Sequence, residues 1–327
     1  MSGVVVTDPS ISIHTKAQRV VAVRDGGIIQ DWPINRVESV TLMAGSEISR
    51  SALDVLLRHR IPVHYVGFYG DYLGSALPPD GSHVDLRVRQ ALALSNSVVR
   101  LGIARSWVVE KIVEQRLLLL YRVRGRDNDV RDRMAEICSK LDRATKAAED
   151  ADQLPRLLGI EGSAAKLGFS GMNLLLPEEF RFAQRNRRPP RDPFNALISL
   201  GYTVAATQLV SLLASKGFDP YLGFLHKPHR GRPALALDLL ELVRAPWVDR
   251  WALDLVARRQ IKLEDFETSG GRGVRLSDPE QRRACIRMLL QRFHEPLPGP
   301  LTTGKETCID RVTRRVNSLH TVLKNLP

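Results

Sequence analysis

The chain is poor in cysteine, and the cysteines it has are far apart. Only Cys138, Cys285 and Cys308 occur among 327 residues, and no CxxC pair is present. This spacing argues against a thiolate zinc site and against a disulfide framework. We therefore expect a protein of a reducing compartment, the cytoplasm.

Long apolar runs and targeting signals are also missing. No segment approaches about 20 consecutive apolar residues, so we expect no membrane-spanning helix. The opening residues, MSGVVVTDPS, contain neither a basic stretch nor an apolar core of signal-peptide length. The glycine-rich stretches RDGG, SGGRGVR and PLPGP lack the GxxxxGK[ST] and GxGxxG patterns, which argues against a phosphate-binding nucleotide loop.

Acidic residues are outnumbered by basic ones. The chain has 48 Lys and Arg against 36 Asp and Glu, a net charge of +12 and a pI near 10.0. Such a balance favours a polyanionic partner, either nucleic acid or an acidic lipid surface. The hydrophobic share of 43% is enough for a sizeable core, and the length suggests about two domains.

Hydrophobic periodicity divides the chain into two parts. Residues 1–77 contain short β-branched runs separated by Gly, Asp and Pro, interrupted by one helical pattern over residues 46–60. Residues 78–87 form the best candidate linker, since the stretch LPPDGSHVD has two prolines and a glycine. From residue 88 to 327 the spacing is helical, including one run from Arg87 to Leu119. We expect an α+β protein with a small β domain followed by a larger all-α domain.

Carboxylates in apolar surroundings are the strongest chemical signal. In ALALDLLELV, Asp238 and Glu241 lie three residues apart and project from one face of a helix. Glu161 lies in LLGIEGSAAKLGF and His226 in GFLHKP. Buried charges are unfavourable unless they are paired or bind a metal. Two or three carboxylates with one imidazole would suit Mn²⁺ or Mg²⁺, and could also hold Zn²⁺.

Each of these residues also has an ordinary interpretation. His226 could be a structural histidine, and Glu161 a plain loop acid. Asp238 could pair with Arg244 while Glu241 faces water. A zinc pair made of His226 and His229 is disfavoured, because Pro228 opposes a regular helix between them and no cysteine is near in sequence.

Two basic segments accompany the carboxylates. One is the Pro-broken stretch RFAQRNRRPPR, and the other follows His226 directly. Arginine and lysine on such loops can neutralise phosphates without reading bases, although a solvated charged loop has the same composition. The basic residues are Arg181, Arg185, Arg187, Arg188 and Arg191 in the first segment, and Lys227, His229, Arg230 and Arg232 in the second.

Several blocks of the sequence resemble a known family. NALISLGY, GFDPYLGFLH and LALDLLELVRAPWVDRWAL, in this order, are similar to the signature blocks of the CRISPR-associated spacer-acquisition integrase, which is also described as a metal-dependent DNA endonuclease. IEGSAAKLGF resembles the block with the family's first metal-binding glutamate, and RNRRPPRDPFNAL its basic loop. The resemblance extends over nearly the whole chain.

The resemblance implies a fold, an activity and a site. It implies an N-terminal β-sandwich-like domain, an α-helical catalytic domain and a homodimer. It implies metal ligation by Glu161, His226 and Glu241, with Asp238 as a further catalytic-site residue beside a Mg²⁺ or Mn²⁺ ion. Double-stranded spacer and repeat DNA and a small companion protein of CRISPR adaptation are the implied partners. The expected DNA-binding residues are Arg185, Arg187, Arg188, Lys227 and Arg230.

The implied reaction joins a spacer 3′-hydroxyl to the repeat strand by transesterification. Two other functions remain open on the residues alone. One is a general metal-dependent nuclease acting on branched or single-stranded DNA or RNA, and the other is a DNA-binding scaffold without catalysis. The chain departs from the family at Gly168-Phe169, where an aromatic pair is usual, and from about Arg292 onward the likeness is weak.

Overall fold

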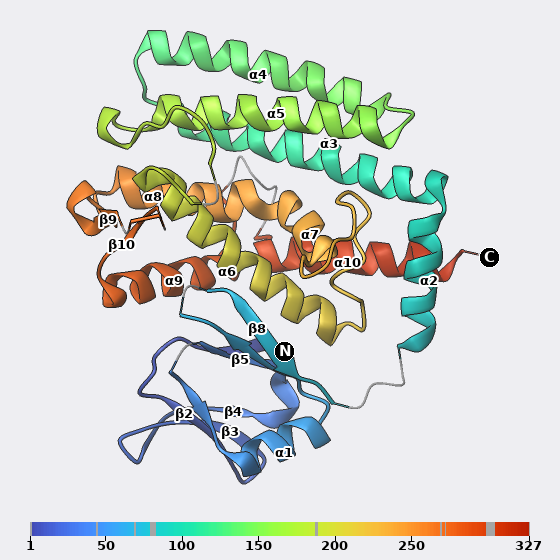
Figure 1. Cartoon of the computed structure of the whole chain (residues 1–327), viewed down its shortest axis with the longest axis vertical. Helices are drawn as coiled ribbons and strands as arrows, with labels where there is room; N and C mark the ends of the chain where they lie inside the picture. Colours follow the sequence, from blue (N-terminus) through green and yellow to red (C-terminus); the bar gives the residue numbers. More distant parts are fainter. Residues whose placement is uncertain are drawn as a thin grey trace.

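The structure is a computed structural model of the chain and describes residues 2–43, 45–68, 70–78, 83–186, 189–268, 270–271, 273–298 and 305–326. A strand-rich part, residues 2–76, lies at one end of the molecule, and helices form the remainder (Figure 1). The expected α+β fold class is confirmed.

Two four-stranded sheets build the strand-rich part. In the first sheet β1, β5 and β7 run parallel to one another, and β8 runs antiparallel to β7. The outer strands of this sheet are β1 and β8. The first sheet contains, in order, β1 (Ser2–Val6), β5 (Val37–Met43), β7 (Val63–Val66) and β8 (Tyr72–Ala76). The second contains β4 (Gly27–Pro33), β3 (Arg19–Arg24), β2 (Ser12–Lys16) and β6 (Glu47–Ile48).

Alternating apolar residues of both sheets form a small core. Val4, Val40 and Val63 come from the first sheet, and Ile13 and Val20 from the second, and all are buried in one cluster. Period-two alternation directs these side chains to one face of each sheet. The expected helix in this part is α1 (Arg50–Arg58). Ser49 caps its N-terminus, and the Ser49 side chain accepts a hydrogen bond from the Ala52 amide.

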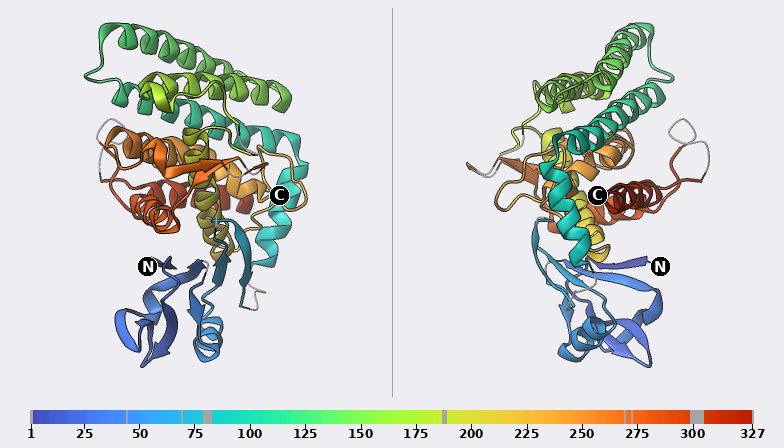
Figure 2. Two further views of the ribbon diagram at one scale, coloured as in Figure 1. Left: turned by 60° about the vertical axis from the view of Figure 1, so that its left-hand side comes forward. Right: turned by 90° about the vertical axis from the view of Figure 1, so that its right-hand side faces the viewer.

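The helical part is layered, with α3, α4 and α5 side by side above the remaining helices (Figures 1 and 2). The run expected as one helix from Arg87 is divided at Asn96, whose side chain accepts hydrogen bonds from the amides of Val98 and Val99. The helices are α2 (Val84–Ser95), α3 (Ser97–Arg122), α4 (Asn128–Glu149), α5 (Leu154–Leu175), α6 (Pro193–Ser215), α7 (Ala234–Arg244), α8 (Arg250–Ala257), α9 (Pro279–Phe293) and α10 (Cys308–Lys324).

Two details of this part differ from the sequence prediction. A short hairpin of β9 (Phe266–Thr268) and β10 (Val274–Leu276) lies within the part expected to be all-α. Helix α2 begins at Val84, inside the stretch predicted as a linker, and residues 79–82 of that stretch lie outside the described part. The proposed division into domains at residues 77 and 88 stays a prediction.

A π-helical turn, Ala245–Asp249, joins α7 to α8 in one continuous helix. Pro246 lies in this turn, and proline lacks the amide hydrogen that an α-helix would require there. The turn is packed firmly, because Trp247 donates a 2.7 Å hydrogen bond to the Leu289 carbonyl and stacks on Phe293 at 4.1 Å.

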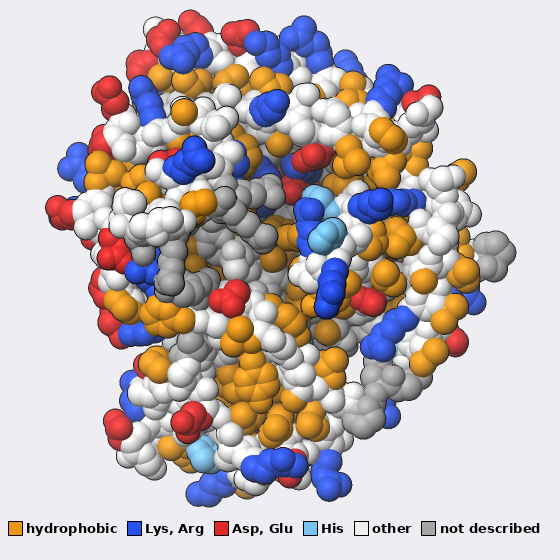
Figure 3. Space-filling model, viewed as in Figure 1, with side chains coloured by type: hydrophobic (Ala, Val, Ile, Leu, Met, Phe, Trp, Pro, Cys, Tyr) orange, Lys and Arg blue, Asp and Glu red, His pale blue; other side chains and the backbone are white. Residues whose placement is uncertain are grey.

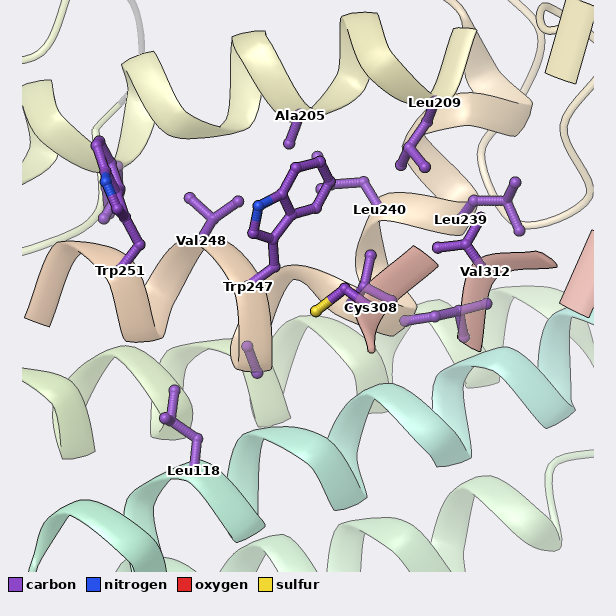
Figure 4. Close-up of a cluster of buried hydrophobic side chains, with 14 of the residues drawn as sticks. Leu118, Ala205, Leu209, Leu239, Leu240, Trp247, Val248, Trp251, Cys308 and Val312 are labelled. Atoms are coloured by element: carbon purple, nitrogen blue, oxygen red, sulfur yellow. The ribbon is translucent and has the colours of Figure 1, made fainter. Parts of the chain in front are cut away.

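The main core surrounds this joined helix. Trp247 and Trp251 pack among apolar side chains from α3, α6, α7 and α10 (Figure 4). Helix α6 is long and apolar enough to cross a membrane by length and composition alone. Most of its apolar window is buried inside the fold, as in the central helix of a folded domain.

The strand-rich part touches α6 closely. The Thr207 hydroxyl donates a 3.0 Å hydrogen bond to the Gly70 carbonyl. Gly70 has φ +81°, and a Cβ at this position would lie 2.5 Å from Val204. Glycine is therefore required here for both its backbone conformation and its lack of a side chain.

Candidate functional site

Helix α7 carries the two carboxylates singled out in the sequence. Asp238 is fully buried, and the Glu241 side chain is 13% exposed. Apart from Arg244 at its end, the other residues of this helix are apolar and hold it in the core, so both acids are kept largely away from solvent. The interpretation that Glu241 faces water is wrong.

Asp238 fixes the loop that carries His226. One carboxylate oxygen accepts the amides of Phe224 (2.6 Å) and Leu225 (2.9 Å). The other oxygen accepts the amide of His226 (2.9 Å) and lies 2.6 Å from the ring nitrogen Nδ1. Asp238 therefore does not pair with Arg244, and it acts as an acceptor for a tightly turned loop.

The hydrogen bond from Nδ1 also sets the chemistry of His226. The carboxylate of Asp238 accepts only from a protonated Nδ1, and in the neutral form of such a ring Nε2 carries the free lone pair. A carboxylate behind an imidazole is the usual arrangement for a metal-binding histidine. The His226 side chain is 22% exposed, so the ring is partly open to solvent.

Helices α2 and α3 hold the same loop from its other side. The buried Gln90 amide donates 2.9 Å hydrogen bonds to the carbonyls of Asp219 and Leu222, and its oxygen accepts the Asp219 amide. Arg100 donates to the Phe224 carbonyl at 2.9 Å. The position of His226 thus depends on residues more than a hundred positions earlier in the chain.

Glu161 lies inside α5 and not in a loop as one interpretation had it. Its carboxylate accepts a hydrogen bond from the Lys111 ammonium of α3, and the same ammonium lies 2.6 Å from Glu241 Oε2. Lys111 is 1% exposed. One buried cation therefore joins two carboxylates that are 80 residues apart in the sequence.

The charges around Glu241 keep it ionised. Burial by itself would raise the pKa of the Glu241 carboxyl. The charges of Lys111 and Arg244, with a smaller contribution from His226, outweigh burial and lower this pKa to about 2. Glu241 is a carboxylate at neutral pH and is close enough to His226 to sense its charge.

Glu161, Glu241 and His226 offer the oxygen and nitrogen donors that a divalent cation requires. Two carboxylates bonded to one nitrogen lie at most about 6 Å apart. Among the described residues, no set of three His, Cys, Asp or Glu side chains is close enough to enclose an ion as placed, and Lys111 occupies the space between the two glutamates. The donor types, carboxylate oxygen and imidazole nitrogen, fit Mg²⁺ or Mn²⁺.

Arg244 links the site to a group of aromatic side chains. Its guanidinium lies 3.3 Å from Glu241 and 3.6 Å from Asp249, between the rings of Phe169 and Tyr202. Burial would lower the pKa of Arg244, but Tyr202 and the neighbouring carboxylates raise it above its ordinary value. The Tyr202 hydroxyl donates to Asp249 in turn.

A cavity of about 750 Å³ opens beside Glu241 and Arg244, between α6 and the loop after His226. Basic residues surround it, and Figure 3 shows histidine, lysine and arginine side chains gathered beside a hollow on this face. Lys227 and Arg230 are exposed, with Arg230 lining the cavity. Arg185 also lines it, but its guanidinium is held by Asn195 (2.8 Å) and Ser199 (3.0 Å).

Two predicted residues cannot be placed, and three residues near the site were not predicted. Arg187 and Arg188 lie outside the described residues, so their expected role in DNA binding stays a prediction. Sequence reasoning missed Lys111, Gln90 and Tyr202. A lysine within the apolar run SWVVEKIVEQRLLLL was the signal for Lys111, because a buried ammonium needs anionic partners.

Known proteins share this arrangement of elements. The model of the family described as CRISPR associated protein Cas1 matches residues 4–289, and it ends near the point where the likeness was expected to weaken. The chain is 35% identical over 281 residues to the CRISPR-associated endonuclease Cas1 3 of Thermus thermophilus, which covers 85% of this chain and 81% of that protein.

Solved structures agree with the sequence comparison. A Cas1 protein from Thermotoga maritima superposes with a TM-score of 0.77 at 26% identity, over 99% of this chain and 97% of that one. A chain of a Cas6-RT-Cas1–Cas2 complex gives a TM-score of 0.79 at 28% identity, over 99% of this chain and 35% of that one. Fold, family model and curated relatives converge, and the chain belongs to the Cas1 family of CRISPR-associated proteins.

Proposed function

We propose that the chain is a metal-dependent DNA integrase and endonuclease of CRISPR adaptation, which inserts spacer DNA into the repeat array by transesterification through a 3′-hydroxyl. The observation that carries the proposal is that Glu161 and Glu241, from separate helices, both contact the buried ammonium of Lys111. His226 is close enough for its charge to act on Glu241, and a basic cavity opens beside Glu241.

Glu161, His226 and Glu241 would hold Mg²⁺ or Mn²⁺. When bound, such a cation offsets negative charge on the phosphoryl oxygens. Asp238 holds Nδ1 of His226, so Nε2 is the ring nitrogen left available to the cation. Arg244, held in place by Glu241 and Asp249, presents a permanent positive charge at the cavity wall. The exposed Lys227 and Arg230 neutralise backbone phosphates, and the proposal gives Arg185, Arg187 and Arg188 the same role.

The partners follow from the same proposal. The chain acts as a homodimer on double-stranded spacer and repeat DNA in the cytoplasm, together with a small companion protein of CRISPR adaptation. A solved assembly whose title names both Cas1 and Cas2 contains a chain with this fold, which supports the companion. The net charge of +12 supports a DNA partner.

The test is the Glu241→Ala variant in a strand-joining assay with added Mn²⁺. We expect joining to fall by at least about 100-fold, because one of three cation ligands is lost. Glu264→Ala, a loss of an exposed acid far from the site in sequence, is the matched control. Full joining activity in the Glu241 variant would refute the proposed ligand set.

The same gel separates the competing functions. Hydrolysis products without joined strands would favour a general nuclease. Joining that persists unchanged in chelator would contradict metal dependence, and DNA binding without either product would favour a scaffold.

A further inference from the structure

Lys111 contacts both glutamates of the site, and its side chain is almost completely buried. Its ammonium pairs with Glu161 and Glu241, while its side chain is 1% exposed and reaches them from α3, a third helix. An ammonium is unfavourable in such a place unless anions surround it. Two carboxylates provide those anions, so the present arrangement is electrically satisfied without any metal.

We propose that Lys111 is an internal counter-ion that takes the place of the divalent cation in the metal-free protein and must withdraw before the cation can bind. This inference rests on the proposed function, since it assumes that Glu161 and Glu241 are metal ligands. Its consequence is that Lys111 weakens metal affinity and sets the cation concentration at which the site fills.

Geometry and charge both support competition. Oxygen ligands of Mg²⁺ lie about 2.1 Å from the ion, which places neighbouring oxygens about 3 Å apart. Lys111 Nζ, at 2.6 Å from Glu241 Oε2 and bonded to Glu161, occupies the space that an ion bridging the two oxygens would need. An ammonium left in contact would also repel a doubly charged ion at short range in a poorly solvated site.

The structure contains a second acceptor for the displaced ammonium. Gln115 lies one turn further along α3, is 3% exposed, and neither atom of its amide has a hydrogen-bond partner among the described residues. Residues 111 and 115 are four positions apart on α3 and therefore lie on the same face of the helix. A buried amide without partners is unusual and calls for an explanation. The Gln115 carbonyl would accept Lys111 once the glutamates hold a cation.

The space for Gln115 is made by Gly168 of α5. A Cβ at position 168 would lie 3.1 Å from the Gln115 amide, closer than most real contacts. This is the position where the chain departs from the aromatic pair that the family resemblance predicts. Glycine at position 168 leaves room for the Gln115 amide, which a larger residue would occupy.

The experiment measures Mn²⁺ affinity of the full-length protein directly, by calorimetry or by electron paramagnetic resonance of free Mn²⁺. Lys111→Met keeps the volume and removes the charge, and we expect Mn²⁺ to bind about tenfold more tightly or better. In chelator the melting temperature of this variant falls, and Mn²⁺ raises it by more than it raises that of the wild type. Lys140→Met, which removes an exposed lysine on α4, is the control for net charge.

Two results separate this inference from the proposed function. If the wild type binds no Mn²⁺, or Glu241→Gln binds it as the wild type does, the proposed metal site is wrong. If the wild type binds Mn²⁺ through Glu241 and folded Lys111→Met binds it equally or more weakly, the counter-ion role of Lys111 is wrong.

A variant that does not fold is covered by a measurement on the wild type. In crystals soaked with Mn²⁺, Lys111 Nζ should have left both carboxylates, and an ammonium still bridging them beside a bound ion would overturn the proposal. Gln115→Met should weaken Mn²⁺ binding, opposite to Lys111→Met. Unchanged affinity in that variant would exclude Gln115 as the second acceptor.

Discussion

At the scale of single residues, the site depends on carboxylates that do different work in similar surroundings. Glu161 and Glu241 meet a cation, whereas Asp238, only three residues from Glu241, binds three backbone amides and an imidazole. The sequence placed all three acids in apolar surroundings but could not assign these roles. The difference arises from which loop or helix each acid faces.

We expect Asp238→Asn to destabilise the fold by about 2–4 kcal/mol. An asparagine has one acceptor atom, so its amide group would face two hydrogen-bond donors that have no other buried acceptor. Urea denaturation measures the change, and Glu264→Gln is the control at an exposed acid. A loss below about 1 kcal/mol would show that the loop does not depend on this carboxylate.

His64 on β7 makes stability depend on pH. The side chain is fully buried, and neither ring nitrogen has a hydrogen-bond partner among the described residues. Burial lowers the pKa of His64 from 6.5 to about 4. As the pH falls from 6.5 toward 4, His64 takes up a proton in the unfolded chain but not in the folded protein. The free energy of unfolding therefore decreases.

The expected size of this effect is about 2 kcal/mol between pH 7.5 and pH 5. His64→Leu should remove that part of the pH dependence, measured by urea denaturation at both pH values. His59→Leu changes an exposed histidine and should leave it unaltered. Equal pH dependence in the wild type and in His64→Leu would contradict the assignment.

At the scale of elements, the loop before α7 is positioned by helices distant in sequence. Gln90 makes three hydrogen bonds to residues 219 and 222, and this contact joins α2 to the segment leading to His226. The positions of the helices were predictable, because burial of one helix face produces a regular spacing of apolar residues. This loop contact was not, since a glutamine in a helical pattern reads as an exposed residue.

Gln90→Leu should lower the free energy of unfolding by about 2 kcal/mol, because buried backbone groups at Asp219 and Leu222 would lose their partner. Amide hydrogens of the loop should also exchange faster. Hydrogen-exchange mass spectrometry and urea denaturation test both, with Gln291→Leu on the exposed face of α9 as control. Unchanged exchange in this loop would mean that Asp238 and Arg100 suffice to hold it.

The break at Asn96 shows the same limit of sequence reasoning. The residues on both sides continue a helical spacing, and only the asparagine side chain, which accepts two amides, marks the start of a new helix. Helix α6 shows another limit, since nearly all its faces are buried and periodicity carries little information there. The meeting of Lys111 with two glutamates needed the packing of three helices, which no local pattern encodes.

At the scale of the whole molecule, net charge bears on the kind of partner that the protein binds. The net charge of +12 and the exposed lysine and arginine near the cavity favour a polyanion, which is DNA in the function proposed above. Such binding releases counterions and weakens steeply with salt. It reads little of the base sequence.

We expect the logarithm of the DNA affinity to fall linearly with the logarithm of salt concentration, with a steep slope. Lys227→Ala and Arg230→Ala should each reduce the slope by about one. Fluorescence anisotropy with a duplex of fixed length gives the slope, and Lys140→Ala is the control. A slope that neither variant changes would place the DNA elsewhere on the surface.

The π-helical turn at Ala245–Asp249 imposes a constraint on chain length. Each residue of a helix turns the next by about 100°, so deleting one residue here would rotate all of α8 against α7. Asp249 would lose its ion pair with Arg244 and its hydrogen bond from Tyr202. Trp251 would lose its present packing in the core. Natural variation in this stretch should therefore proceed by replacement alone, with the number of positions held constant.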